Sequence, residues 1–146
     1  MLYLGADHAG FELKEAIKEF LKLQEIPFED LSAGPMVPGD DYPVVTEKLS
    51  RKVLADPANR GVLLCANGVG VCMAANKHPG IRAGIGYNLL AAETMRTDDN
   101  ANVLCLAGSV LQPDFARAIV RKFLDTEFSN DERHIRRLEM VAKLEV

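Results

Sequence analysis

Residues 61–77, with the sequence GVLLCANGVGVCMAANK, limit what this chain can fold into more than any other segment. The apolar run predicts a buried strand that ends at Cys65, and the glycines after it predict a turn over residues 66–70 and then a short helix. A cysteine at the carboxyl end of such a strand lies where open α/β sheets bind ligands. The N–H groups of the turn and the helix N-terminus can hold an anion and favour a thiolate. The segment therefore predicts a base or nucleophile beside a cradle for negative charge.

Short apolar runs alternate with helical periods along the whole chain. We expect strands over residues 2–6, 28–31, 61–65, 82–86 and 102–106. We expect helices over residues 9–25, 44–55, 88–96, 114–124 and 130–143, besides the short helix after residue 70. Strands separated by helices imply right-handed crossovers and a parallel sheet covered on both faces. The prediction is one α/β domain over residues 1–146, a three-layer α/β/α sandwich with about five parallel strands, Rossmann-like or flavodoxin-like. Its last helix is longer than the sheet needs and is expected to reach a partner subunit.

Composition narrows the function classes. The chain has 146 residues, 48% of them hydrophobic, and a net charge of −4, so nucleic-acid binding has no bulk electrostatic support. No apolar run approaches the ~18 residues that a membrane-spanning helix needs, and the sequence does not open on a signal-peptide pattern. Cys65, Cys72 and Cys105 form no CxxC pair and do not fall at zinc-ligand spacing with the histidines. We expect a cytoplasmic protein without a metal, a membrane partner or a nucleic-acid partner.

Cys65 has two readings on its own, since a cysteine that closes a buried strand is often a small core residue. Gly68 and Gly70 favour chemistry, because they let the backbone approach a ligand closely. The turn does not match a dinucleotide fingerprint, since Met73 stands where a third glycine belongs, and the chain has no Walker loop.

A second polar group, Asp7 and His8, ends the first predicted strand within the sequence GADHAG. Because parallel strands share one carboxyl edge, both side chains can face Cys65. Asp7 suits substrate hydroxyls, and His8 suits a phosphate or a ring oxygen. The alternative is that Asp7 caps the first helix while His8 is a polar surface residue.

Arg133 and Arg137 share one face of the last predicted helix, with His134 beside them. Two guanidinium groups on one stripe can grip a phosphate monoester by forked hydrogen bonds. The alternative is a solvated face on which the arginines pair with Glu132 and Glu139.

Two loops add further candidates. Tyr42 lies in a loop rich in proline and aspartate, where it can line a pocket or anchor the loop. The polar turn RTDDNAN, residues 96–102, precedes the fifth predicted strand, and we expect it at the ligand-binding edge. Asp98 and Asp99 would then reach a substrate, or they only make the turn.

These segments together resemble the type B ribose-5-phosphate isomerase family, which includes the galactose-6-phosphate isomerase subunits. The likeness runs through nearly the whole chain. It comprises GADHAG at 5–10, DYP at 41–43, C-x-x-GVG at 65–70, AANK at 74–77, GIRA at 80–83, NANVL at 100–104 and RH-x-x-R at 133–137.

The resemblance implies an aldose–ketose isomerisation through a cis-enediolate, without a metal or other cofactor. By position, Cys65 would move the proton between C1 and C2. The enediolate would be held by the N–H groups of Ala66, Asn67, Gly68, Val69 and Gly70. The sugar would be bound by Asp7, His8, Tyr42 and Asp99, and the phosphate by Arg133 and Arg137. The family also implies a homodimer or a dimer of dimers with pockets at the subunit interface.

Three positions depart from the family pattern. Asp98 stands where a ring-opening histidine is common, and it can replace that histidine only if it holds a proton near neutral pH. Asn67 stands where threonine or serine is usual, and its amide can donate but cannot act as a hydroxyl relay. Ser109 replaces an arginine that helps to bind phosphate in many members.

The prediction is an enzyme of the pentose phosphate pathway that interconverts ribose 5-phosphate and ribulose 5-phosphate as a homodimer. One alternative changes the substrate to a hexose 6-phosphate, such as galactose or allose 6-phosphate. Another is a sugar-phosphate-binding module without activity, against which the retention of Cys65 argues.

Overall fold

The computed structural model describes residues 1–145, so only Val146 of the predicted domain lies outside the described residues. Within them, five strands form one sheet: β1 (Leu2–Ala6), β2 (Phe28–Asp30), β3 (Arg60–Cys65), β4 (Ala83–Ile85) and β5 (Val103–Ala107). The same residues form six helices: α1 (Phe11–Leu23), α2 (Tyr42–Leu54), α3 (Val69–Ala75), α4 (Leu89–Thr97), α5 (Pro113–Asp125) and α6 (Glu132–Ala142). Each predicted element is found, with ends that agree within about two residues.

All neighbouring strands are parallel, in the order β2-β1-β3-β5-β4. After β3 the chain skips the neighbouring position in the sheet and forms the edge strand β4. It then returns, so that β5 lies between β3 and β4. The central strands β1, β3 and β5 are almost wholly buried, which explains why their sequences are nearly continuous apolar runs. The predicted α/β fold with a five-stranded parallel sheet is confirmed.

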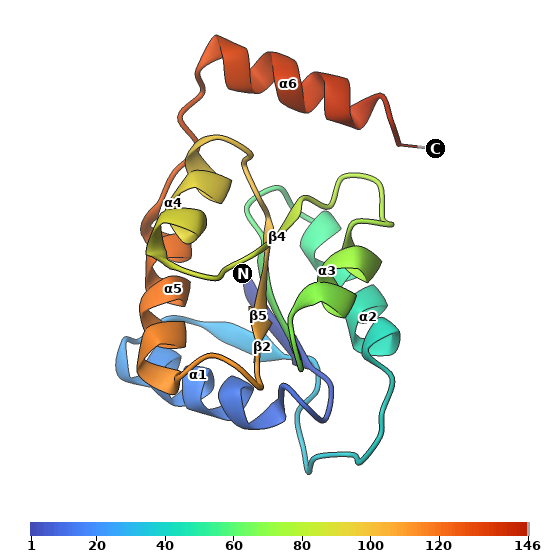
Figure 1. Ribbon diagram of the computed structural model, residues 1–146, viewed down its shortest axis with the longest axis vertical. Helices are drawn as coiled ribbons and strands as arrows, with labels where there is room; N and C mark the ends of the chain where they lie inside the picture. Colours follow the sequence, from blue (N-terminus) through green and yellow to red (C-terminus); the bar gives the residue numbers. More distant parts are fainter. Residues whose placement is uncertain (146) are drawn as a thin grey trace.

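Helices cover both faces of the sheet (Figure 1). On one face α1, α4 and α5 pack on the strands through side chains such as Ile17, Met95 and Ile119. On the other face α2 and α3 pack through Leu49 and Val71. Each layer therefore buries one side of the sheet. None of the helices in residues 1–145 is long and apolar enough to cross a membrane.

The carboxyl ends of β1, β3 and β5 meet at one edge, which we call the carboxyl rim. Asp7 N–H donates to the Leu64 carbonyl (3.2 Å), and Gly108 N–H donates to the Cys65 carbonyl (2.8 Å). These backbone bonds set Asp7, Cys65 and Gly108 in a row. Since β1 continues into α1 on one face and β3 into α3 on the other, a crevice opens between them, the usual ligand site of such sheets.

The turn at residues 96–102 lies at the other edge of the sheet, which corrects the expectation that it joins the ligand-binding edge. Asn102 N–H donates to the Arg82 carbonyl (3.0 Å), and the Asn102 carbonyl accepts from Gly61 N–H (2.9 Å), where β3 begins. The reason is chain direction, because a turn that precedes a parallel strand must lie at its amino end. We call this edge the amino edge.

Helix α6 also lies beyond the amino edge, set apart from the sheet (Figure 1). Its one buried side chain is that of His134, while Arg133 and Arg137 are exposed. The Ser129 hydroxyl and His134 Nδ1 lie 2.9 Å apart and fix the start of the helix.

A buried lysine ties α1 to the end of β2. The Lys14 side chain has no exposed surface, and its Nζ donates to Asp30 Oδ2 (2.7 Å) and to the Ser32 carbonyl (2.8 Å). The Ser32 hydroxyl in turn accepts from Ala6 N–H at the end of β1 (3.0 Å). Burial opposes ionisation of Asp30, but hydrogen bonds from Lys14 and Lys18 outweigh it and hold the pKa of Asp30 below its usual value. This network therefore fixes the residue that precedes Asp7.

Lys14→Met should lower the free energy of unfolding by about 3 kcal/mol, because it leaves a buried carboxylate with only Lys18 as its cationic partner. Urea unfolding measures the change. Lys22→Met, at an exposed position of the same helix, is the matched control and should stay within about 0.5 kcal/mol. Equal losses in the two variants would contradict the role given to Lys14.

Candidate active site

Cys65 ends β3 at the carboxyl rim with only 4% of its surface exposed. Its thiol lies 3.8 Å from Asn67 Oδ1. The same oxygen accepts the Val69 N–H (3.0 Å). Asn67 therefore holds the turn against the start of α3 and contacts the sulfur at the same time.

Two glycines shape this turn. Gly68 has a φ of +76°, and a Cβ there would come within 3.1 Å of the Leu106 backbone carbon, so both conformation and space require glycine. A Cβ on Gly70 would lie 2.8 Å from Cζ of Tyr42. The Tyr42 ring therefore packs directly on the turn.

The N–H groups of the turn are not equivalent. Val69 N–H is taken by Asn67, so it is not free for an oxyanion. In the part of the chain that the structure describes, the N–H groups of Ala66, Asn67, Gly68 and Gly70 have no acceptor. These four remain as candidates for holding developing negative charge.

Asp7 is 6% exposed and bonds to the chain just before α1. Its Oδ1 accepts the N–H groups of Ala9 and Gly10, both at 3.0 Å. The alternative of a local structural role is thus present in the structure. It uses one carboxylate oxygen, and a carboxylate has further lone pairs for a ligand.

His8 is held by an aspartate that the sequence analysis did not single out. Asp40 Oδ1 accepts the His8 backbone N–H (2.6 Å) and lies 3.1 Å from its Nδ1. The hydrogen bond with Asp40, and to a lesser extent the charge of Asp7, raises the pKa of His8 against the effect of desolvation. Because His8 and Asp40 lie 32 residues apart, no local pattern marks the pair. The only local sign of a partner for His8 is the pair of aspartates in GDDYP, residues 39–43.

His8 lies between two hollows. One, of about 150 Å³, is lined by Asp7, His8 and Asp40 together with the loop after β2. The other, of about 420 Å³, lies between His8, Phe11 and Ser109. Ser109 N–H donates to the Ala66 carbonyl (3.0 Å), so one residue that lines this second hollow also contacts the Cys65 turn.

The remaining predicted residues lie at the amino edge, away from Cys65. Asp98 accepts a hydrogen bond from the Thr97 hydroxyl (2.7 Å), and its Oδ1 lies 3.9 Å from His134 Nε2 on α6. Burial, followed by the charge of Asp98, raises the pKa of Asp99. Asp98 and Asp99, together with Arg133 and Arg137 on α6, make up a second polar group of residues at this edge. One chain does not bring the two groups together.

No group of three or more histidine, cysteine or acidic side chains within residues 1–145 is placed to hold a metal ion. Among the described residues, the carboxyl rim carries the Cys65 thiol, the Asp7 carboxylate, the His8 imidazole and the backbone N–H groups of the turn.

A family model described as Ribose/Galactose Isomerase matches residues 2–141. The chain belongs to the ribose/galactose isomerase family. One relative, the probable ribose-5-phosphate isomerase B of Mycoplasma pneumoniae, is 38% identical over 144 residues, which is 99% of this chain and 94% of the relative.

Another relative shows that the ribose/galactose isomerase family is not confined to one sugar. The D-erythrulose-4-phosphate isomerase of Pectobacterium atrosepticum is 35% identical over 86% of this chain and 82% of its own length. Among solved structures, the ribose-5-phosphate isomerase B of Mycoplasma genitalium with bound ribulose 5-phosphate superposes with a TM-score of 0.87. It is 35% identical and covers 98% of this chain and 94% of its own.

Asp40→Asn should lower the pKa of His8 toward its ordinary value, because the amide replaces the carboxylate that stabilises the imidazolium. Histidine ring signals followed by NMR across a pH titration measure this shift. Asp41→Asn, which changes the neighbouring exposed carboxylate, should leave the His8 titration in place. A His8 curve that is the same in wild type and Asp40→Asn would rule out the pairing in solution.

Proposed function

We propose that this chain interconverts ribose 5-phosphate and ribulose 5-phosphate by metal-free aldose–ketose isomerisation. The observation that carries the proposal is the row of Asp7, Cys65 and Gly108 at the carboxyl rim, where the thiol lies beside a turn with free N–H groups. Proton abstraction next to a carbonyl needs this combination of a placed base and a site for the resulting anion. The relative solved with ribulose 5-phosphate supports the choice of substrate.

Cys65, as the thiolate, removes the proton from C2 of the open-chain aldose. The charge passes to O1 and gives an enediolate, which the N–H groups of Asn67, Gly68 and Gly70 stabilise. The hydroxyl proton moves from O2 to O1, and the thiol returns its proton to C1, so the product is the ketose. Asp7 and Tyr42 bind the sugar from either side of the crevice.

Ring opening needs a group that takes the proton of the anomeric hydroxyl and one that protonates the ring oxygen. His8 suits the second task, since Asp40 raises its pKa and keeps it protonated closer to neutral pH. We assign the first task to Asp98 of a second copy, which acts here as a base and so does not need the proton that direct replacement of a ring-opening histidine would require. Asp99 of that copy binds the sugar beside it.

The geometry of one chain supports the proposal of a second copy. Asp98, Asp99, Arg133 and Arg137 lie at the amino edge, with α6 set apart from its own sheet (Figure 1). In a dimer with a two-fold axis, each amino edge can face the partner's carboxyl rim, so two equal sites form. Arg133 and Arg137 then bind the substrate phosphate, which anchors the sugar far from the reacting carbons. We propose this homodimer, alone or paired into a dimer of dimers, as the active form. The three free cysteines of each chain suit a reducing compartment, and we expect the protein in the cytoplasm.

Cys65→Ala should lower kcat for ribose 5-phosphate by a factor of about 100 to 10,000, the usual contribution of a placed general base. The assay follows ribulose 5-phosphate formation with EDTA present, and erythrose 4-phosphate and hexose 6-phosphates are tested alongside. Cys72→Ala changes the half-buried thiol on α3 and should keep kcat within a few fold. Turnover of only a tetrose or hexose phosphate would replace the proposed substrate, and sugar-phosphate binding with no turnover at all would indicate a binding module.

Mixed dimers test the shared site. Cys65→Ala and Arg137→Gln chains should each be inactive alone, and their co-expression should restore about a quarter of the wild-type activity, because half the dimers hold one intact site of two. The measurement is the specific activity of the whole co-expressed mixture, purified without separating the mixed dimers from the two parent dimers. If Arg137 served the Cys65 of its own chain, every mixture would stay inactive.

A further inference from the structure

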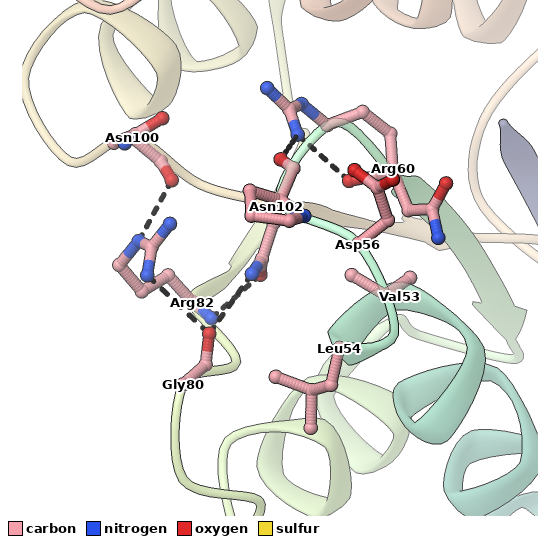
Figure 2. A pocket seen from close by; sticks show the side chains of 10 residues that line it. Val53, Leu54, Asp56, Arg60, Gly80, Arg82, Asn100 and Asn102 are labelled. Atoms are coloured by element: carbon pink, nitrogen blue, oxygen red, sulfur yellow. Dashed lines mark hydrogen bonds between the residues drawn. The ribbon is translucent and has the colours of Figure 1, made fainter.

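A third polar hollow lies at the amino edge, outside every residue assigned so far (Figure 2). Its volume is about 290 Å³, at the lower end of small-molecule sites. Val53 and Leu54, at the end of α2, form its apolar wall. The opposite wall is polar and carries Arg60 and Arg82 from the starts of β3 and β4.

Both guanidinium groups are fixed by backbone carbonyls. Arg60 Nη1 donates to the carbonyls of Pro57 and Asn59, each at 2.8 Å. Arg82 Nε donates to the Asn100 carbonyl (2.8 Å), and its Nη1 lies 3.4 Å from the Gly80 carbonyl. Figure 2 shows Arg60 and Arg82 at different places around the hollow, with Asn102 between them. A guanidinium group has five N–H donors, so both keep donors for a further partner.

Two acidic side chains lie near this pair, but neither forms an ion pair with it: Glu145 accepts the Gly80 N–H (2.8 Å), and Asp56 lines the hollow. Among residues 1–145, no carboxylate oxygen lies within 4.0 Å of either guanidinium group. Asp56 lines the hollow, but its Oδ1 accepts the Ala58 N–H (2.8 Å). Burial, followed by the charge of Arg60, lowers the pKa of Arg82, and the charge of Glu145 opposes this only in part. Two cations that repel one another in a half-buried hollow are stabilised by a bound anion.

We propose that this hollow is a second anion-binding site, which takes the phosphate group of a small phosphorylated metabolite between Arg60 and Arg82. The apolar wall of Val53 and Leu54 then contacts the organic part of that metabolite. The site is separate from the phosphate grip assigned to Arg133 and Arg137. It reaches the catalytic machinery only through Arg82, which also holds the Asn100 carbonyl two residues after Asp98.

Inorganic phosphate titrated into the wild-type protein, with backbone amide signals followed by NMR, tests the site. The amides of Gly80, Arg82 and Asn102 report the hollow, and those of Gly68 and Ser109 report the carboxyl rim. We expect saturable shifts at the first group. Arg60→Gln should weaken them about tenfold or more, the value of a lost charged hydrogen bond, and should leave the rim titration unchanged. Arg51→Gln removes an exposed arginine of α2 and is the control for net charge.

Three results would overturn the proposal. Phosphate shifts confined to the rim would leave the hollow without a ligand, as would happen if a carboxylate of a second copy fills it. If Arg60→Gln and Arg51→Gln weaken phosphate binding equally, the loss comes from the lower net charge and not from a contact in the hollow. Unchanged binding in Arg60→Gln would remove that arginine from the site. The titration needs no turnover, so its outcome is independent of the isomerase assay.

Discussion

The parallel pairing of β1 with β3 is the constraint on which the rest of the site depends. Their register, with Ala6 opposite Leu64, places Asp7 beside Cys65 and lets one strand supply the carboxylate and the other the thiol. The two strands continue into helices on opposite faces, which opens the crevice between them. Gly68 then brings the following turn against β5, within reach of the Leu106 backbone. If this register slipped by one residue, Cys65 and Asp7 would no longer share the crevice.

The sheet separates the residues that we propose for proton transfer from those that we propose for phosphate binding within one chain. Groups suited to proton transfer gather at the carboxyl rim, while the arginines of α6 and the Asp98–Asp99 turn lie beyond the amino edge. One copy does not bring these two groups together, and the proposed dimer joins them through a two-fold axis. The exposed apolar side chains of α6, Ile135, Met140 and Val141, agree with a helix that is completed by contact with another chain.

The sequence predicted the alternating elements, the Cys65 turn and the polar end of β1, because hydrophobic periodicity and glycine positions act locally. It did not predict Asp40 or Lys14, whose roles depend on contacts between distant segments. Asp40 lies among other aspartates of a loop, and Lys14 reads as part of the polar face of α1 although it is fully buried. The misplaced turn at 96–102 has a different cause. Chain direction alone puts a turn before a parallel strand at the amino edge, so the sequence held that information.

A crystal structure of the wild-type protein with ribulose 5-phosphate tests the central claim most directly. The account predicts the Cys65 sulfur against C1 and C2 of the sugar, the N–H groups of Asn67, Gly68 and Gly70 toward its oxygens, and the phosphate on Arg133 and Arg137 of a second copy. A sugar bound wholly within one chain, or one whose reacting carbons lie away from Cys65, would contradict it.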